Sequence, residues 1–241
     1  MDQAPIIVAY DGSPHAEDAL ALAAALADAG ASRLAVAHVY RAPRSGVRTG
    51  AASRRGRERF MRATAHDLLG RVSPGAGRQP RPLVIGSTTT ARGISTLAQR
   101  EGAALVVWGS ASDAPPGHVR PGSAARRLLQ GGPCAQAFAP AGFRERDRHR
   151  PTTVTLGEHD ADADARSSVH GLAEALGASV AAGARGEDTL LVLGSRPDAE
   201  EGRVLASAGT DRAIRTAGGP VVVLSRGHGL GLGGRPAAVA A

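Results

Sequence analysis

A stretch of six residues occurs twice in this chain in nearly the same form. Residues 105–110 read LVVWGS and residues 190–195 read LLVLGS. Farther along, each copy continues into a Gly-Gly-Pro sequence, at 131–133 and at 218–220. Similarity at matched positions this far apart is typical of an internal repeat, in which each copy is one supersecondary unit. The sequence therefore predicts two related folding units in one polypeptide.

The first unit alternates short apolar runs with stretches of helical character. Its first apolar run is followed by Ser13 and Pro14, and the alanine- and leucine-rich stretch behind them lasts to Gly30. Ser13 can cap this helix, Pro14 suits its first position and Gly30 ends it. Strands are predicted over 6–9, 34–39, 81–86, 104–108 and 134–139, and helices over 14–29, 53–72, 94–98 and 123–130.

This order predicts an α/β fold with a doubly wound, five-stranded parallel sheet in flavodoxin-like order. The run over 104–108 has no polar alternation, so its strand should be buried on both faces. On the longest helix, Phe60 and Leu69 fall toward one face, which we expect to be the apolar one. Ligands of open parallel sheets bind where the strand order reverses, here between the first and fourth strands.

The second unit repeats the pattern in a shorter form after the charged linker 144–150. It lacks a counterpart of about residues 40–99, so we expect a truncated module. Its predicted elements are strands over 153–156 and 178–182, a helix over 168–176, a strand from Thr189 and a last strand over 221–225. The predicted domains are 1–143, a degenerate second domain over 151–226, and a flexible tail over 227–241.

Composition limits the class of protein. Hydrophobic residues make up 42% of the 241 residues and charged residues 21%, as in ordinary globular domains. No apolar run reaches the roughly 20 residues that span a bilayer, and the N-terminal residues lack a signal-peptide pattern. We therefore expect a cytoplasmic protein without a membrane partner.

The charged and sulfur-containing residues exclude several chemistries. All 29 basic residues are arginine, which removes the P-loop lysine and Schiff-base catalysis. The single cysteine, Cys134, excludes an intrachain disulfide and cysteine-cluster metal sites. The net charge of +7 would attract polyanions, but an aromatic share of 2% leaves few rings for bases to stack on. Specific nucleic-acid binding is not expected.

Three parts of the first unit together resemble the universal stress protein family. They cover residues 5–140 well, whereas 151–226 match only loosely. They are the strand end Val8-Ala9-Tyr10-Asp11-Gly12-Ser13, the pair His38-Val39, and the late segment from Trp108-Gly109-Ser110 through Gly122-Ser123 to Gly132-Pro133-Cys134.

The family carries a loop motif of Gly, two residues, Gly, nine residues, and Gly followed by Ser or Thr. Members that keep this motif bind ATP. In this chain the loop reads Gly109, Ser112 and Gly122-Ser123, so the outer spacing is kept and the middle glycine is serine. A glycine at this position adopts positive φ without strain. Ser112 would be strained at positive φ, although its side chain offers a hydroxyl. Gly109 would allow close backbone approach to a phosphate, and the helix start at Ser123 would favour an anion.

The resemblance implies a site for an adenine nucleotide, ATP with or without Mg²⁺. Asp11 would contact the ribose, and Ala9, Tyr10 and Val39 would lie at the adenine. Asp11 could instead be a turn residue, Val39 a core residue, and the loop 109–123 a surface connection. The candidate nucleotide-binding residues are Ala9, Tyr10, Asp11, Val39, Gly109, Ser112, Gly122 and Ser123.

Other polar residues near this loop have weaker claims. Asp113 could repel a triphosphate or hold a divalent metal. Arginines 120, 126 and 127 stand where guanidinium groups could reach phosphates. His15 and His118 are expected to be ordinary solvated side chains.

In the second unit both ligand elements are expected to be degenerate. Gly157 falls in the place of Asp11. The segment from Gly194 to Gly209, which we align with the first loop, is two residues longer than the one from Gly109 to Gly122. One nucleotide per chain is therefore expected.

The expected function is a cytoplasmic stress or regulatory module that binds ATP in its first domain. It is expected not to be an enzyme beyond slow ATP hydrolysis, because no catalytic constellation stands near the loop. The alternative is an interaction module that binds no nucleotide and acts through dimerisation, and a nucleotidyl-transferring enzyme is a third class. The unguarded final strands, 134–139 and 221–225, are expected to pair antiparallel within one molecule, and a second chain could add at the opposite edge.

Overall fold

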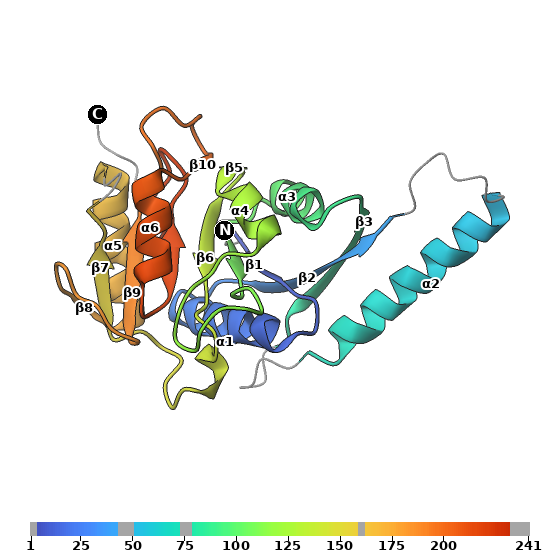
Figure 1. The fold of residues 1–241 in the computed structure, drawn as a ribbon, viewed down its shortest axis with the longest axis horizontal. Coiled ribbons are helices and arrows are strands. Elements are labelled where there is room, and N and C mark those ends of the chain that lie inside the picture. The colour runs from blue at the N-terminus through green and yellow to red at the C-terminus, as the bar shows by residue number, and fades with distance from the viewer. Residues whose placement is uncertain (1–3, 43–50, 73–78, 159–161, 232–241) are drawn as a thin grey trace.

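One sheet of nine strands runs through the part of the chain that the structure describes (Figure 1). The computed structural model describes residues 4–42, 51–72, 79–158 and 162–231. The strand order is β3-β2-β1-β4-β6-β11-β9-β7-β8. The strands are β1 Ile6–Ala9, β2 Leu34–Arg41, β3 Arg81–Ser87, β4 Leu105–Trp108, β6 Ala135–Phe138, β7 Thr153–Leu156, β8 Ser179–Val180, β9 Thr189–Leu193 and β11 Val221–Val223.

Helices cover both faces of this sheet. On one face α1 and α5 bury Leu26 and Leu172 in a common apolar cluster. On the other face α3, α4 and α6 bury Leu97, Leu128 and Ile214 in a second cluster. The helices are α1 Pro14–Ala29, α2 Ala51–Gly70, α3 Thr90–Glu101, α4 Ser123–Leu128, α5 Ala163–Leu176 and α6 Ala208–Thr216.

The start and end of α1 were predicted correctly. The Ser13 hydroxyl accepts a hydrogen bond from the Ala16 N–H at 3.2 Å, and proline stands at the first helical position. Gly30 is the C-terminal cap. This helix places the turn between β1 and α1, which contains Asp11, at the carboxyl end of the sheet.

The longest helix, α2, extends away from the body of the molecule (Figure 1). Leu69, near its C-terminal end, is 5% exposed, whereas Phe60 is 72% exposed. The prediction that Phe60 shares a buried apolar face with Leu69 is wrong, because α2 turns Glu58 toward β2 instead, where Glu58 accepts a hydrogen bond from the Tyr40 hydroxyl at 3.3 Å.

The strand order reverses between β1 and β4, as predicted. β1 pairs in parallel with β2 on one side and with β4 on the other. The predicted pairing of the two final strands is also confirmed. β11 runs antiparallel to β6, with Val221 opposite Phe138 and Val223 opposite Gln136, so the predicted strand through Ser225 ends two residues early.

Matching serines in the two halves make the same hydrogen bonds. Ser110 follows β4 and Ser195 follows β9, and each hydroxyl donates to a carbonyl 29 residues later, at 2.8 and 2.6 Å. Each also accepts a bond from an amide N–H ten residues later, at 3.2 and 3.1 Å. The repeated sequence therefore corresponds to a repeated local structure.

Strand register aligns β7 with β1. Ile6 lies opposite Leu105, and Val154 lies opposite Leu190. Leu105 and Leu190 each begin one copy of the six-residue repeat. The first position of β1, Ile6, therefore corresponds to Val154.

This register corrects one sequence alignment. Gly157 corresponds to Ala9 and not to Asp11, whose counterpart falls within 159–161, outside the described residues. Thr155 takes the place of Ile7. It is 2% exposed, and its hydroxyl has no hydrogen-bond partner in the described parts of the chain.

The predicted lengthening of the second loop is also wrong. Ser207 is the N-terminal cap of α6, as Gly122 is of α4. The distance along the chain from Gly194 to Ser207 equals that from Gly109 to Gly122. Ser207, and not Gly209, is therefore the counterpart of Gly122.

Three further features differ from the expectation. α5 begins at Ala163, five residues before the predicted 168, because the side chain of Asp162 accepts a hydrogen bond from the Ala165 N–H. Of the strand predicted over 178–182 only β8, Ser179–Val180, forms, and residues 181–188 after it are turns and coil. A two-stranded ribbon, β5 Gln130–Gly132 with β10 Val204–Leu205, joins the two halves and was not predicted.

The start of the predicted tail belongs to the folded part. Leu230 is 4% exposed, and its N–H donates to the Ser168 hydroxyl at 2.9 Å. Residues 232–241 lie outside the described part of the chain. Among the helices that are described, none is both long and apolar enough to cross a membrane.

Candidate functional site

A cavity of about 370 Å³ lies at the carboxyl ends of β1 and β4, where the strand order reverses. Residues from the β1–α1 turn, from β2, and from the loop between β4 and α4 form its wall. All eight sequence-predicted residues line it, namely Ala9, Tyr10, Asp11, Val39, Gly109, Ser112, Gly122 and Ser123.

Asp11 is exposed and lies in the turn after β1. Its Oδ1 accepts a hydrogen bond from the Ser13 N–H at 3.0 Å, which holds the turn. The carboxylate therefore has a local structural role, and it also stands at the cavity wall. Asp11 can therefore hold the turn and also face a ligand in the cavity.

Tyr10 reaches the cavity differently from the expectation. Its ring is buried in the cluster under α1, and its hydroxyl donates to Glu17. Burial, followed by the hydrogen bond to Glu17, raises the pKa of Tyr10. Its carbonyl oxygen lies 2.9 Å from Nδ1 of His38, which also lines the wall. Since the ring points into the core, the residue can offer a ligand mainly its backbone.

Val39 is partly buried and packs against the second core cluster. A β-carbon placed on Gly93 of α3 would lie 2.6 Å from Cγ1 of Val39, so α3 approaches β2 closely here. Val39 therefore has a core role as well as a place in the cavity wall.

Gly109 is required by a contact within the protein. A β-carbon on this residue would lie 1.9 Å from the carbonyl oxygen of His15, in the first turn of α1. Gly109 was expected to allow close approach to a phosphate, but it is also needed for the packing of the loop against α1. The sequence alone could not show it, because His15 is distant along the chain.

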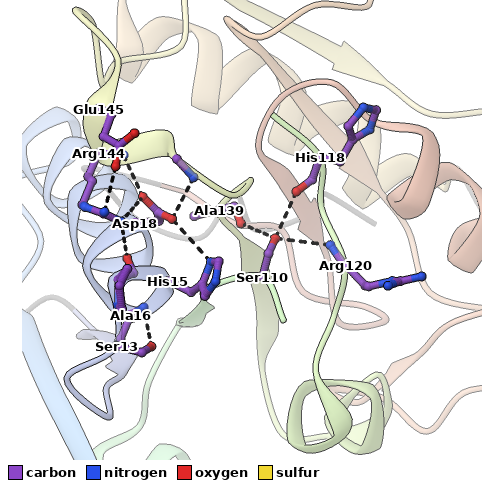
Figure 2. Close-up of polar contacts among 12 residues, drawn as sticks. Ser13, His15, Ala16, Asp18, Ser110, His118, Arg120, Ala139, Arg144 and Glu145 are labelled. Carbon is purple, nitrogen blue, oxygen red and sulfur yellow. Dashed lines mark hydrogen bonds and ion pairs between the residues drawn. The ribbon is translucent and has the colours of Figure 1, made fainter. Parts of the chain in front are cut away.

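The loop behind Gly109 is fixed by Ser110. The buried hydroxyl of Ser110 donates to the Ala139 carbonyl and accepts from the Arg120 N–H (Figure 2). The loop is also bonded to the segment after β6, since the Gly117 N–H donates to the Ala141 carbonyl at 2.9 Å. This side of the cavity is therefore held in a defined conformation.

Ser112 is exposed and its φ is not positive. The expectation of backbone strain at this serine is therefore wrong. At the far end of the loop, Gly122 caps α4 without a side-chain hydrogen bond, and a β-carbon there would meet open space. Since α4 has six residues, its dipole is short, and the site offers the N–H groups near Gly122 and the Ser123 hydroxyl.

The predicted phosphate-binding arginines do not line the cavity. Arg120 instead pairs with Asp113 on the surface at 2.5 Å, and Arg126 and Arg127 are exposed on α4. Within the described ranges no group of three or more histidine, cysteine, aspartate or glutamate side chains could hold a metal ion.

His15 was expected to be an ordinary solvated side chain, but it lies in the wall of the cavity. Its side chain is 25% exposed, and its Nδ1 is 3.8 Å from Oδ2 of Asp18, which is fully buried. Asp18 also accepts hydrogen bonds from the N–H groups of Gly142 and Arg144, each at 2.9 Å (Figure 2). The spacing of His15 and Asp18 by three residues on a helix was the available signal.

Solved structures share the fold over nearly the whole chain. A universal stress protein from Archaeoglobus fulgidus DSM 4304 has a TM-score of 0.57 and 13% identity, covering 92% of this chain and 98% of its own. A universal stress protein from Pseudomonas aeruginosa UCBPP-PA14 has a TM-score of 0.55 and 13% identity, covering 92% and 93%. A functionally unknown protein from P. aeruginosa PAO1 has a TM-score of 0.54 at 13% identity, covering 91% and 92%.

A search of curated proteins gives no match to this sequence. The model of the universal stress protein family matches residues 4–137, the part that contains the cavity and every element of its wall. That match covers more than half of the chain, and it agrees with the motif residues at the reversal of strand order. The chain belongs to the universal stress protein family.

Proposed function

We propose that the chain binds an adenine nucleotide, ATP, in the cavity between β1 and β4, and acts as a regulatory module of the stress response. One observation carries the proposal. The eight residues predicted from the family motif, which are scattered from Ala9 to Ser123, all line the same cavity. Its volume of about 370 Å³ lies in the usual range for small-molecule sites, roughly 300 to 1,000 Å³.

The wall offers suitable groups for each part of the nucleotide. Asp11 can accept hydrogen bonds from a ribose with the carboxylate oxygen that does not hold the turn. Ala9, Val39 and nearby apolar side chains can contact a base. Ser123 and backbone N–H groups of the loop can donate to phosphates, each bond contributing about 1.5 to 3 kcal/mol. Three or four such bonds approach the roughly 8 kcal/mol of a micromolar ligand.

The proposed module is not an efficient enzyme. Ser110 donates to the Ala139 carbonyl, so it is not poised as a nucleophile. The wall carries a single carboxylate, Asp11, among its described residues. Any Mg²⁺ would therefore be held mainly by the phosphates, where it would neutralise their charge.

We further propose that the second half is a tandem copy of the first that has lost the segment from α2 to α3. The matched bonds of Ser110 and Ser195 support this, as does the shared register of β1 and β7. The copy is expected to bind no nucleotide. Ser207 accepts a hydrogen bond from the Thr210 N–H, and so occupies the helix start that Gly122 leaves open.

The alternative is a module that binds no nucleotide and acts through contacts with other chains. The observations that favour it are the serine at position 112 and the absence of arginine from the described wall. Binding of ATP to the purified protein separates the two proposals.

The test is calorimetric titration of the full chain with ATP. We expect one nucleotide per chain and at least about tenfold weaker binding by Gly122→Val, whose side chain would enter the cavity, equivalent to about 1.4 kcal/mol. Gly171→Val in α5 is the matched control, since a β-carbon there also meets open space. No binding by the wild type would favour the alternative, and unchanged affinity in Gly122→Val would remove the loop from the site.

A further inference from the structure

His15 stands where the β1–α1 turn meets the loop after β4. Its carbonyl oxygen faces Gly109, the first residue of that loop, and its side chain lines the cavity. The imidazole therefore lies at the end of the cavity that holds the loop.

One side of the imidazole faces a buried carboxylate. Nδ1 of His15 is buried and has no hydrogen-bond partner in the parts of the chain described, and Oδ2 of Asp18 is 3.8 Å away. Because Nδ1 faces Asp18 and the side chain is 25% exposed, the Nε2 edge is the one that remains for the cavity. Figure 2 shows the ring beside this carboxylate.

The cavity needs positive charge if it is to hold a triphosphate. Histidines 15 and 38 are its only ionisable basic side chains among the described wall residues. Nδ1 of His38 is engaged with the Tyr10 carbonyl, beside β1. Of these two histidines, His15 is the one whose backbone contacts Gly109 at the start of the loop.

From this arrangement we propose that His15, backed by Asp18, is the phosphate-charge sensor of the nucleotide site. The protonated ring donates from Nε2 to a terminal phosphate, while its Nδ1–H faces the Asp18 carboxylate. This proposal rests on the proposed function, because it names the group that recognises the phosphates of the nucleotide.

The groups around His15 act in opposite directions. The positive end of α1 disfavours a cation at this position, and Arg144 partly neutralises Asp18 through an ion pair at 3.3 Å. Asp18 itself, the nearby Asp11 and an arriving phosphate all favour the charged imidazole. Binding of a triphosphate would add negative charge beside the imidazole, so proton uptake by His15 should accompany binding.

Two consequences follow from this proton linkage. ATP should bind more tightly at pH 6 than at pH 8, and one coupled proton limits the gain to about tenfold per pH unit. Adenosine, which has no phosphate, should bind without proton uptake.

The experiment is calorimetry of the full chain with ATP and with adenosine at pH 7, in buffers of different ionisation enthalpy, which counts the protons taken up. We expect uptake with ATP that falls in His15→Gln, together with about tenfold weaker binding at pH 6. ATP phosphates themselves titrate near pH 6, so the difference between wild type and variant carries the result. His15→Arg should bind ATP more tightly than His15→Gln, and its affinity for ATP should vary less with pH than that of the wild type.

His118→Gln is the matched control, because His118 is exposed on the same loop and does not line the cavity. Thermal unfolding checks that each variant folds. ATP binding with equal proton uptake in wild type and His15→Gln would overturn the sensor while leaving the nucleotide site in place. Absence of ATP binding at every pH would overturn both proposals.

Discussion

Gly109 lies so close to His15 that a β-carbon at position 109 would come within 1.9 Å of the His15 carbonyl oxygen. Gly109→Ala should therefore force the loop and α1 apart and lower the free energy of unfolding by about 2 kcal/mol. Urea denaturation measures this. Gly122→Ala, whose added carbon meets open space, should leave stability nearly unchanged, and an equal loss in both would contradict the packing argument.

Asp18 joins the first helix to the segment that leads into the second half. Asp18→Ala would leave the N–H groups of Gly142 and Arg144 without their acceptor. We expect a loss of about 3 kcal/mol in the free energy of unfolding, since these are bonds to a buried charge. Asp147→Ala, at an exposed position, is the control. A loss below about 1 kcal/mol would mean that the segment is held by other contacts.

Thr155 carries a buried hydroxyl without a partner in the described structure. Thr155→Val keeps the shape and removes the polar atom, so it should raise the free energy of unfolding by about 1 kcal/mol. Thr153→Val, at the partly exposed start of the same strand, serves as the comparison. Destabilisation by Thr155→Val would show that the hydroxyl has a partner in solution.

Burial raises the pKa of the Cys134 thiol to about 12, although a hydrogen bond with the Val106 backbone lowers it slightly. Labelling by a thiol reagent at pH 8 should therefore be far slower in the native protein than in denaturant. The unfolded thiol, with a pKa near 9, loses its proton first. Because the folded protein keeps this proton longer than the unfolded chain, the free energy of unfolding should fall as pH rises from about 9 toward 12. Rapid native labelling would contradict the buried position.

The β6–β11 pairing should be essential for the fold of both halves. Val222 is fully buried at its centre, opposite Ala137. Val222→Asp would bury a charge without a partner and should lower the free energy of unfolding by about 4 kcal/mol or prevent folding. Val180→Asp, at a site 46% exposed on the edge strand β8, should be tolerated. A well-folded Val222→Asp protein would show that the two halves do not depend on this contact.

Local sequence signals predicted the elements whose causes are local. Ser13 and Pro14 fixed the start of α1, and the uncharged valine run near Val222 indicated a strand that needs a partner. The family motif also identified the residues of the cavity wall. In each case neighbouring residues, or a spacing along the chain, carry the signal.

The missed features depend on contacts between distant segments. The ribbon of β5 and β10 pairs segments that are distant along the chain, and β5 consists of Gln-Gly-Gly, which has low strand propensity. A second kind of miss is local: Arg120 was expected at the phosphates, but the path of the loop places it beside Asp113, seven residues earlier. Phe60 was predicted on the apolar face of α2, but the face that carries Glu58 meets β2, so the Phe60 ring is mostly exposed.

The pairing of β6 with β11 within one polypeptide has a consequence for behaviour in solution. Two separate chains that meet through an edge strand come apart on dilution, and each can exchange its partner for a related protein. Here both strands belong to the same molecule, so their local concentration is set by the linker between them and not by how much protein is present. The half that contains the cavity therefore meets its companion at the same local concentration whatever the amount of protein in solution.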